Sequence, residues 1–403
     1  MKDQETARRH FLKTGLTILG GTTLGLRYAN SLPFHFGSET VRIGVIGTGD
    51  RGTGLMRLIN QIDGLIVTAC SDIIPFRLAD AIQLSKGAKS YPDYRDLLAD
   101  NKVDAVLVTT PFSTHDEIAI DALRAGKHVY CEKTMAKGLD EIQAVITAAE
   151  STDLVFQTGH QYHSSALYNR ARAIIRSGYI GEVTAYECQW NRNGNWRRPV
   201  PDPKWERMIN WRMYREYSGG LVAELMSHQI DFINWVTESH PEQVTGFGGI
   251  DHWKDGRETF DNVHLLFKYP SGLDASFECT TTNGFGDYRI KVMGSEGTIM
   301  LDYTKGTIYA EQKEIAEKGL VDGVSGATIQ AWQKGEGAPI DAPGNDPTLD
   351  ALKQFYASIV DGSTVISSLH TGATTAKCVQ ISLDALYQNQ IKKWDEYPEL
   401  KFS

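Results

Sequence analysis

Between residues 41 and 158 the chain alternates short, almost uninterrupted apolar runs with segments whose apolar residues recur at helical spacing. Runs that are apolar at nearly every position are typical of parallel strands covered on both faces. Their regular alternation with helices predicts an α/β fold with a doubly wound, Rossmann-type parallel sheet. The expected strands are residues 41–46, 65–72, 103–110, 128–133 and 154–159.

The second half of the chain shows a different pattern. Val263, Leu265 and Phe267 alternate with His264 and Lys268, which is the period of a strand with one buried face. Further strands are expected at 183–190, 244–249, 273–281 and 287–302. We predict a C-terminal α+β domain with a large open, mainly antiparallel sheet, suited to hold a substrate or to pair with a second subunit. Two final helices, 348–360 and 372–388, should cover the core, and the glycine-rich segment 319–345 should be a loop.

Three glycines in the turn after the first strand have the spacing G-x-G-x-x-G. Gly47 permits a tight turn, Gly49 lets a pyrophosphate approach the backbone, and Gly52 lets the next helix pack closely on the strand. The motif requires a strand before it and a helix after it, and both are predicted here. The N-terminus of that helix offers free N–H groups to phosphate. We therefore expect a dinucleotide on Gly47, Thr48, Gly49, Asp50, Arg51 and Gly52.

A carboxylate stands at the end of the second predicted strand. It belongs to Asp72, 20 residues after Gly52. A carboxylate there accepts hydrogen bonds from ribose hydroxyls and repels a 2′-phosphate, so it favours NAD over NADP. The alternative is an aspartate that caps a turn in an α/β domain without a nucleotide.

Composition limits the partners. The chain is 41% hydrophobic and 23% charged, which is ordinary for a soluble globular protein. Its net charge is −9 and it has no long basic run, so we expect no nucleic-acid partner. The five cysteines are scattered, form no C-x-x-C pair and stand in apolar runs. They predict buried thiols instead of disulfides or a zinc site.

The first 37 residues differ from the rest. Arg8 and Arg9 are followed by Phe11, Leu12 and Lys13 and then by a modestly apolar segment, 15–26, too short and glycine-rich to span a bilayer stably. The order closely resembles a bacterial twin-arginine export signal, which predicts a periplasmic protein. The alternative is a basic, disordered N-terminus of a cytoplasmic protein. No other segment is long and apolar enough for a stable membrane span. We expect a leader over 1–37, a dinucleotide-binding domain over 38–158 and a substrate-binding and oligomerisation domain over 159–403.

Ligands of doubly wound sheets bind beyond the carboxyl ends of the strands. The residues expected at such ends, and therefore at the cofactor site, are Thr110, Pro111, His115, Glu132 and Lys133. Together with the stretches 94–95, 103–106 and 125–129, they resemble the glucose–fructose oxidoreductase/inositol dehydrogenase family of NAD(P) enzymes.

In that family the fifth strand ends in Glu-Lys-Pro, where this chain has Glu132, Lys133 and Thr134. The resemblance implies that Lys133 contacts the substrate and the nicotinamide ribose. A flexible ammonium at the carboxyl end of a strand is well placed for that role. The alternative is a solvent-facing ion pair between Lys133 and Glu132.

The second domain carries a further set of chemically active residues, Glu224, His228 and Asp231. On an α-helix their i, i+4 and i+7 spacing puts them on one face. His228 can act as a general base, because an imidazole titrates near neutral pH, and either carboxylate can orient it or hold a substrate hydroxyl. The spacing resembles a helix of the same family, in which His228 matches the catalytic base and Glu224 replaces an aspartate. The alternative is a helix face with a capped or core histidine.

The loop 191–199 combines amides, guanidinium groups and an indole, which suit the hydroxyls and C–H faces of a sugar. An exposed or interface loop can have the same composition. The predicted substrate-binding residues are His160, Tyr162, His163, Trp196, Arg197, Trp211 and Asp231. If His160, His163, Glu224 and His228 converge, the alternative is that these four residues form a zinc site. We expect no metal, because the dinucleotide enzyme already accounts for Glu224 and His228.

These features predict an NAD-dependent oxidoreductase that transfers a hydride between a ring hydroxyl of a sugar or glycoside and the nicotinamide. His228 removes the hydroxyl proton, and Lys133 stabilises the developing oxyanion. Related glucoside 3-dehydrogenases imply C3 as the oxidised carbon.

Export of a folded protein into a compartment without a replenished NAD pool predicts a tightly bound NAD. One alternative is a redox-neutral, NAD-dependent glycosidase that oxidises, eliminates, adds water and reduces. An alternative from another class is a non-catalytic module that senses a sugar or NADH. The resemblance also implies a homo-oligomer, a dimer or tetramer formed through the open sheet.

Overall fold

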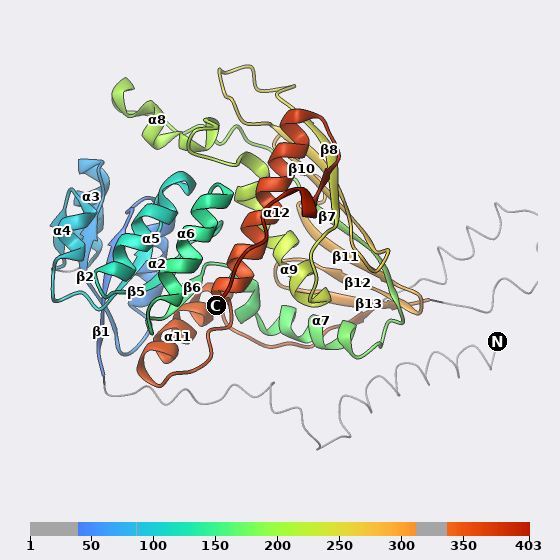
Figure 1. Ribbon diagram of the computed structural model, residues 1–403, viewed down its shortest axis with the longest axis horizontal. Coiled ribbons are helices and arrows are strands. Elements are labelled where there is room, and N and C mark those ends of the chain that lie inside the picture. Colours follow the sequence, from blue (N-terminus) through green and yellow to red (C-terminus); the bar gives the residue numbers. More distant parts are fainter. Residues whose placement is uncertain (1–38, 86, 312–336) are drawn as a thin grey trace, which may run out of the picture.

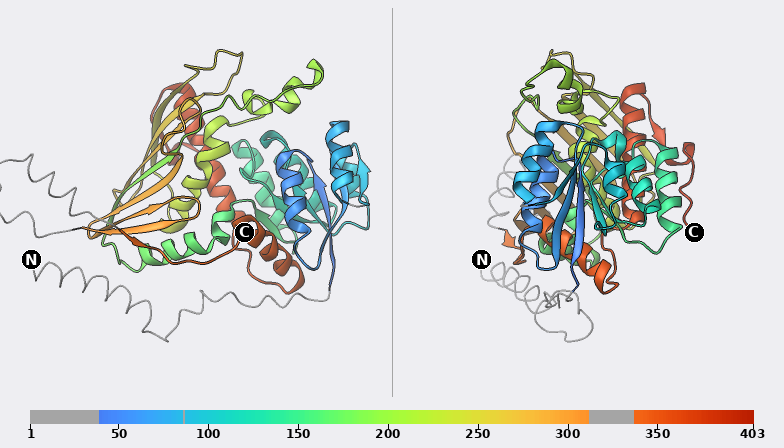
Figure 2. Two further views of the ribbon diagram at one scale, coloured as in Figure 1. Left: turned by 180° about the vertical axis from the view of Figure 1, so that it is seen from behind. Right: turned by 90° about the vertical axis from the view of Figure 1, so that its left-hand side faces the viewer.

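The computed structural model of the protein describes residues 39–85, 87–311 and 337–403. Two sheets stand side by side, each with helices packed against it, and helix α12 (Leu369–Gln388) runs between them (Figure 1). The first sheet lies in the blue and cyan part of the chain, and the second lies mainly in the yellow and orange part (Figure 2). The predicted fold class, a parallel Rossmann-type sheet followed by a second, mainly antiparallel sheet, is confirmed.

All strands of the first sheet run parallel, in the order β3-β2-β1-β4-β5-β6. The chain winds one way from β1 and the other way from β4. The switch point between β1 and β4 is where such sheets bind ligands, beyond the carboxyl ends of the strands. The strands are β1 (Val41–Ile46), β2 (Leu65–Ser71), β3 (Lys89–Tyr91), β4 (Ala105–Val108), β5 (His128–Cys131) and β6 (Phe156–Thr158).

Helices cover both faces of this sheet, which explains why its strands are apolar at nearly every position. The intervening helices are α2 (Asp50–Ile59), α3 (Pro75–Ser85), α4 (Tyr94–Leu98), α5 (His115–Arg124) and α6 (Leu139–Glu150). Near the end of the chain, α11 (Pro347–Val360) returns to this layer and buries Leu352 and Phe355 against Leu55 and Ile59 of α2. The final helices therefore cover the core as expected.

The second sheet has the strand order β14-β13-β12-β11-β7-β10-β9-β8-β15. Its pairs are antiparallel except for β7 and β10, which run parallel. The predicted alternation in β9 is confirmed, because Val263, Leu265 and Phe267 are buried while His264 and Leu266 are exposed. The strands are β7 (Val183–Trp190), β8 (Gln243–Gly249), β9 (Asn262–Lys268), β10 (Asp274–Thr280), β11 (Tyr288–Gly294), β12 (Gly297–Leu301), β13 (Gly306–Ala310), β14 (Ala338–Pro339) and β15 (Lys392–Lys393).

The layer between the two sheets holds the short helix η2 (Gln161–Ser164), α7 (Ala166–Arg176) and α9 (Ser227–Thr237). The segment expected to carry Glu224, His228 and Asp231 on an α-helix is helical but not α-helical throughout. Residues Val222–Met226 form a π-helical turn, and α9 begins after it. The turn matters for the site because a π-helix bonds i to i+5 instead of i+4 and so changes which carbonyls meet neighbouring side chains.

Some predictions fall on residues that the structure does not describe. The twin-arginine leader lies outside the described residues, as does most of the expected loop at 319–345. The five cysteines are described, and all are buried and free, as predicted. Among the described residues, we find no helix whose length and apolarity would allow it to cross a membrane.

We predict that Gly47→Ala destabilises the first domain. Gly47 has φ of 89°, and a Cβ there would lie 2.8 Å from backbone atoms of Thr109 and Thr110. The left-handed conformation and the clash together should lower the free energy of unfolding by about 1–3 kcal/mol. Gly54→Ala in α2 is the control. A Cβ at Gly54 would meet nothing within 4 Å, so this change should stabilise by about 0.5–1 kcal/mol. Equal effects in chemical denaturation would contradict this account of the turn.

Candidate active site

The glycine-rich turn has the shape of a phosphate cradle. A Cβ on Gly52 would lie 2.2 Å from the carbonyl oxygen of Gly47, so α2 approaches the turn as closely as glycine allows. Gly49 precedes α2, and no side chain caps the first N–H groups of that helix. These N–H groups are therefore free for an anion. The residues fit the pyrophosphate of a dinucleotide.

Asp72 stands beside this cradle at the end of β2. Its Oδ2 accepts from the backbone N of Thr48 at 2.8 Å and from Thr48 Oγ1 at 3.2 Å. Its Oδ1 accepts from the backbone N of Ile74 at 2.8 Å. The carboxylate is thus held at the rim of the turn, where it was expected. Sequence reasoning missed Arg77, whose Nη1 lies 3.6 Å from the position of a Cβ on Gly49.

The residues predicted at the end of β4 are Thr110, Pro111 and His115. Thr110 and Pro111 lie just beyond β4, after Thr109, at the switch point. His115 is buried, and its Nδ1 lies 2.8 Å from the carbonyl oxygen of Thr134 while its Nε2 lies 2.9 Å from that of Thr110. Both ring nitrogens are therefore occupied by backbone. His115 therefore ties the loops after β4 and β5 together, and its predicted place at the cofactor site stays a prediction.

Glu132 and Lys133 follow β5, as predicted, but they do not pair with each other. Glu132 is buried and accepts from Arg51 Nε at 2.7 Å. Lys133 Nζ donates to the carbonyl oxygen of Glu224 at 2.7 Å and to that of Ala223 at 3.4 Å. Both carbonyls belong to the π-helical turn. The alternative of a solvent-facing ion pair between Lys133 and Glu132 is therefore excluded.

Burial lowers the pKa of Lys133, and the nearby carboxylates of Glu224 and Glu132 partly offset this effect. An ammonium has three N–H groups, and two of those of Lys133 have carbonyl acceptors. The third is left to donate to an oxygen of a bound substrate. The arrangement can stabilise a developing alkoxide.

His228 lies on the first turn of α9, in a box of aromatic rings. Its ring centroid is 5.2 Å from that of Tyr162, 5.7 Å from Trp190 and 6.0 Å from His160. Burial, together with the positive charge of Lys133, lowers the pKa of His228 well below its ordinary value. The imidazole is therefore neutral at neutral pH, which is the form that accepts a proton.

Glu224 belongs to the π-helical turn, and its carboxylate pairs with Arg212. Its Oε2 accepts from Arg212 Nε at 2.8 Å, and Arg212 in turn stacks on Trp211 at 4.3 Å. The carboxylate thus anchors the connection that carries Trp211. Sequence reasoning missed Arg212, although it directly follows the predicted substrate residue Trp211.

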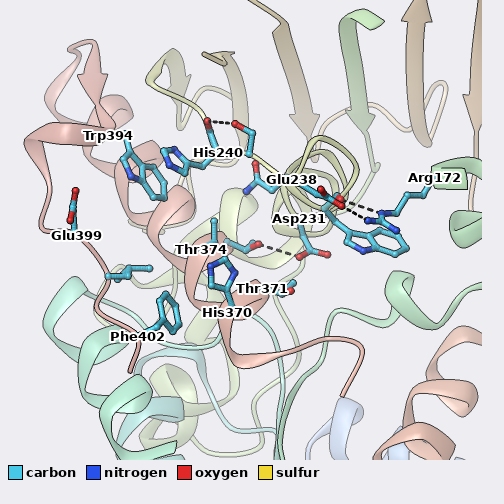
Figure 3. A pocket seen from close by; sticks show the side chains of 15 residues that line it. Arg172, Asp231, Glu238, His240, His370, Thr371, Thr374, Trp394, Glu399 and Phe402 are labelled. Atoms are coloured by element: carbon cyan, nitrogen blue, oxygen red, sulfur yellow. Dashed lines mark hydrogen bonds and ion pairs between the residues drawn. The ribbon is translucent and has the colours of Figure 1, made fainter. Parts of the chain in front are cut away.

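Asp231 and His163 form a buried pair, and each is 1% exposed. Asp231 Oδ2 lies 2.9 Å from His163 Nε2, and Asp231 Oδ1 accepts from Thr375 Oγ1 at 3.2 Å. Figure 3 shows the Asp231 carboxylate at the wall of a cavity of about 520 Å³ between α9, α12 and the C-terminal segment. His163 and Asp231 thus pair with each other, and their predicted contact with a substrate stays a prediction.

Residues 191–218, here called the arm, leave β7 and carry α8 (Glu206–Ile209) over the carboxyl edge of the first sheet (Figures 1 and 2). Arg198 forms an ion pair of 2.5 Å with Asp50 at the glycine-rich turn. The backbone N of Ser113 donates to an arm carbonyl at 3.2 Å, and Lys137 Nζ donates to two others at 2.7 and 2.9 Å. The arm therefore contacts the first domain after β1, β4 and β5.

Two predicted substrate residues lie near the base of the arm. Trp196 packs against the core of the second domain. Arg197 forms ion pairs with Glu206 and with Asp255, the latter at 3.2 Å. Arg197 therefore joins α8 and Asp255 to the base of the arm, and its predicted contact with a substrate stays a prediction.

The zinc alternative requires metal-binding side chains that lie close together. Across residues 39–85, 87–311 and 337–403, no three His, Cys, Asp or Glu side chains come together in a metal-binding group. His163 pairs with Asp231 and Glu224 with Arg212, so the four residues of the zinc alternative do not converge.

Sequence reasoning also missed the aromatic wall next to His228. Trp190, at the end of β7, packs edge to face against Tyr288 and Tyr303, with ring centroids 4.8 and 5.7 Å apart. The guanidinium carbon of Arg192 lies 5.8 Å from the centroid of the Trp190 ring. The available signal was an indole at the carboxyl end of a strand, directly before the polar loop.

Comparison with known proteins identifies the family. Residues 41–160 match the profile of an oxidoreductase family with an NAD-binding Rossmann fold, and residues 168–300 match the GFO/IDH/MocA C-terminal domain. An uncharacterized oxidoreductase of Streptococcus pneumoniae serotype 4 is 30% identical over 280 residues, 68% of this chain and 72% of that protein. The chain belongs to the GFO/IDH/MocA family. The predicted resemblance and NAD as cofactor are thereby confirmed.

Two other GFO/IDH/MocA relatives have named activities. The myo-inositol 2-dehydrogenase of Thermotoga maritima is 27% identical over 282 residues, 69% of this chain and 80% of that enzyme. The 2,7-anhydro-N-acetylneuraminate hydratase of Escherichia coli is 28% identical over 264 residues, 65% of this chain and 68% of that enzyme.

We predict that Asp231→Ala destabilises the protein. The change leaves the buried His163 N–H without its acceptor, which should lower the free energy of unfolding by at least about 1–3 kcal/mol. Thr375→Val is the control, because it removes only the bond of 3.2 Å and should cost about 0.5–1.5 kcal/mol. Thermal denaturation measures both. A raised KM with an unchanged melting temperature would instead show that Asp231 binds substrate.

Proposed function

We propose that this protein oxidises a secondary ring hydroxyl of a sugar or glycoside, at C3, and passes the hydride to a tightly held NAD. The observation that carries the proposal is the meeting of a neutral, buried His228 with Lys133 beneath the carboxyl edge of the NAD-binding sheet. A base next to a hydrogen-bonding cation is what oxidation of an alcohol requires. Relatives named for inositol oxidation and for an anhydro-sugar support a carbohydrate substrate.

In the proposed reaction His228 takes the proton of the substrate hydroxyl. Lys133 Nζ, held by the carbonyls of Ala223 and Glu224, donates its remaining N–H to the same oxygen and stabilises the negative charge that develops there. NAD, when bound, supplies the hydride acceptor. The glycine-rich turn and Asp72 hold the dinucleotide, and Tyr162 and His160 border the base.

Tight retention of NAD forms part of the proposal. The leader with Arg8 and Arg9 supports export of the folded protein to the periplasm, where an exchanging cofactor would be lost. The arm supports retention by the protein itself, because its contacts after β1, β4 and β5 cover the edge where a dinucleotide binds.

A second candidate is the redox-neutral cycle of oxidation, elimination, water addition and reduction. The relative named as a hydratase favours it, because that name describes addition of water. The same residues serve both candidates, and only the released product separates them.

The test starts with protein that is secreted and purified without added cofactor. We expect denaturation to release NAD in a stoichiometric amount, and methyl and nitrophenyl glycosides to produce a lasting reduced-nicotinamide absorbance. Released aglycone without net reduction would favour the redox-neutral cycle. Absence of both NAD and any response would overturn the proposal. A sensing module predicts that the Lys133→Ala, His228→Ala double variant keeps its biological role.

We predict a bell-shaped pH profile of kcat/KM. The lowered pKa of His228 keeps the imidazole neutral, so the acidic limb should lie below its ordinary value of 6.5. The pKa of Lys133 is also lowered, so its ammonium loses a proton as the pH rises, before pH 10.5 is reached. The alkaline limb should therefore lie below pH 10.5, the ordinary pKa of a lysine. His228→Ala should reduce kcat by about 10²–10⁴-fold and remove the acidic limb. An acidic limb at or above pH 6.5 would contradict the assigned base.

A further inference from the structure

Trp190 carries a buried hydrogen-bond donor without an acceptor. The residue ends β7 and is 5% exposed, and its Nε1 has no partner among the described residues. A buried indole N–H in a folded protein normally has a partner. By contrast, Trp253 Nε1 donates to Thr281 Oγ1 at 3.1 Å. The unpaired donor at Trp190 therefore requires an explanation.

Two other unpaired polar atoms lie in the same aromatic box. They are Nδ1 of His228 and Nε2 of His160, again with no partner in the part of the chain that is described. The rings of Trp190 and His228 are 5.7 Å apart, and those of His160 and His228 are 6.0 Å apart. Unpaired polar atoms on three neighbouring rings indicate a place for one polar ligand.

The chemistry of the box indicates what that ligand is. An indole N–H only donates, so it selects an acceptor oxygen. The rings of Tyr288 and Tyr303 pack edge to face against Trp190, and Tyr303, which is 37% exposed, offers apolar ring surface at the outer rim. A polyhydroxylated ring with apolar C–H patches matches such a wall.

We propose that Trp190 is a substrate-binding residue whose indole N–H donates to a ring hydroxyl of the sugar next to the carbon that His228 acts on. This inference rests on the proposed function and names a specificity determinant for it. A site that donates to one hydroxyl discriminates against the analogue that lacks it, because the buried donor is then left unpaired. Trp190 therefore selects among sugars by the presence of one hydroxyl.

Trp190→Phe tests the proposal, because it removes the N–H and keeps an aromatic ring. We expect KM for the glycoside to rise about 3- to 10-fold. The bound NAD content should stay the same. Trp253→Phe is the matched control and should leave KM unchanged.

A panel of monodeoxy glycosides gives the decisive comparison. In the wild type one deoxy analogue should show the same rise in KM, and in Trp190→Phe that analogue should bind no worse than the parent glycoside. NMR of wild-type protein with nitrogen-15-labelled tryptophan provides a second measurement, which does not depend on the activity of the variant. One indole N–H resonance, absent from Trp190→Phe, should shift when the glycoside is added.

Two results would overturn the inference while leaving the proposed function intact. One is an active Trp190→Phe variant with unchanged KM and unchanged discrimination against every deoxy analogue. That result is expected if a water molecule accepts the hydrogen bond of the indole N–H. The other is an indole resonance that does not move in saturated wild-type protein. If no glycoside in the panel binds to the wild type or leads to reduction of its NAD, the proposed function fails together with the inference.

Discussion

The bond from Lys133 Nζ to the carbonyl oxygen of Glu224, 2.7 Å long, is the interaction on which the site depends. It joins the end of β5 in the NAD-binding domain to the π-helical turn of the second domain. A partly buried ammonium is costly unless acceptors surround it, and the changed bonding of the π-helical turn presents two carbonyls to it. His228 follows that turn directly. The same backbone feature therefore positions the His228 imidazole and the Lys133 ammonium.

The rest of the second domain keeps this arrangement in place. The His163–Asp231–Thr375 contacts fasten η2, α9 and α12 to one another behind His228. On the other side, Glu224 and Arg212 fix the arm next to the π-helical turn, and Arg198 extends it to Asp50. His228, Lys133 and the arm are thus parts of one connected structure.

The sequence predicted the residues of local turns well, but it predicted poorly which distant side chains pair with each other. Gly47, Gly52 and Asp72 were predictable because turn geometry and close helix packing depend on near neighbours and on general sheet topology. The π-helical turn that holds Glu224 was missed, since residue spacing does not distinguish such a turn from an α-helix. The partners of the Glu224 and Asp231 carboxylates, Arg212 and His163, come from distant segments. Trp190 was missed because an aromatic residue at a strand end resembles ordinary core until its N–H is found unpaired.

Transfer of hydride from a ring carbon to bound NAD is the central claim, and a labelled substrate tests it most directly. A methyl glycoside deuterated at C3 would be mixed with NAD-loaded protein for a single turnover, the reaction quenched, and the released cofactor examined by mass spectrometry. We predict reduced cofactor carrying one deuterium, and loss of that product in His228→Ala. Cofactor that remains oxidised, or is reduced without deuterium, would contradict the account.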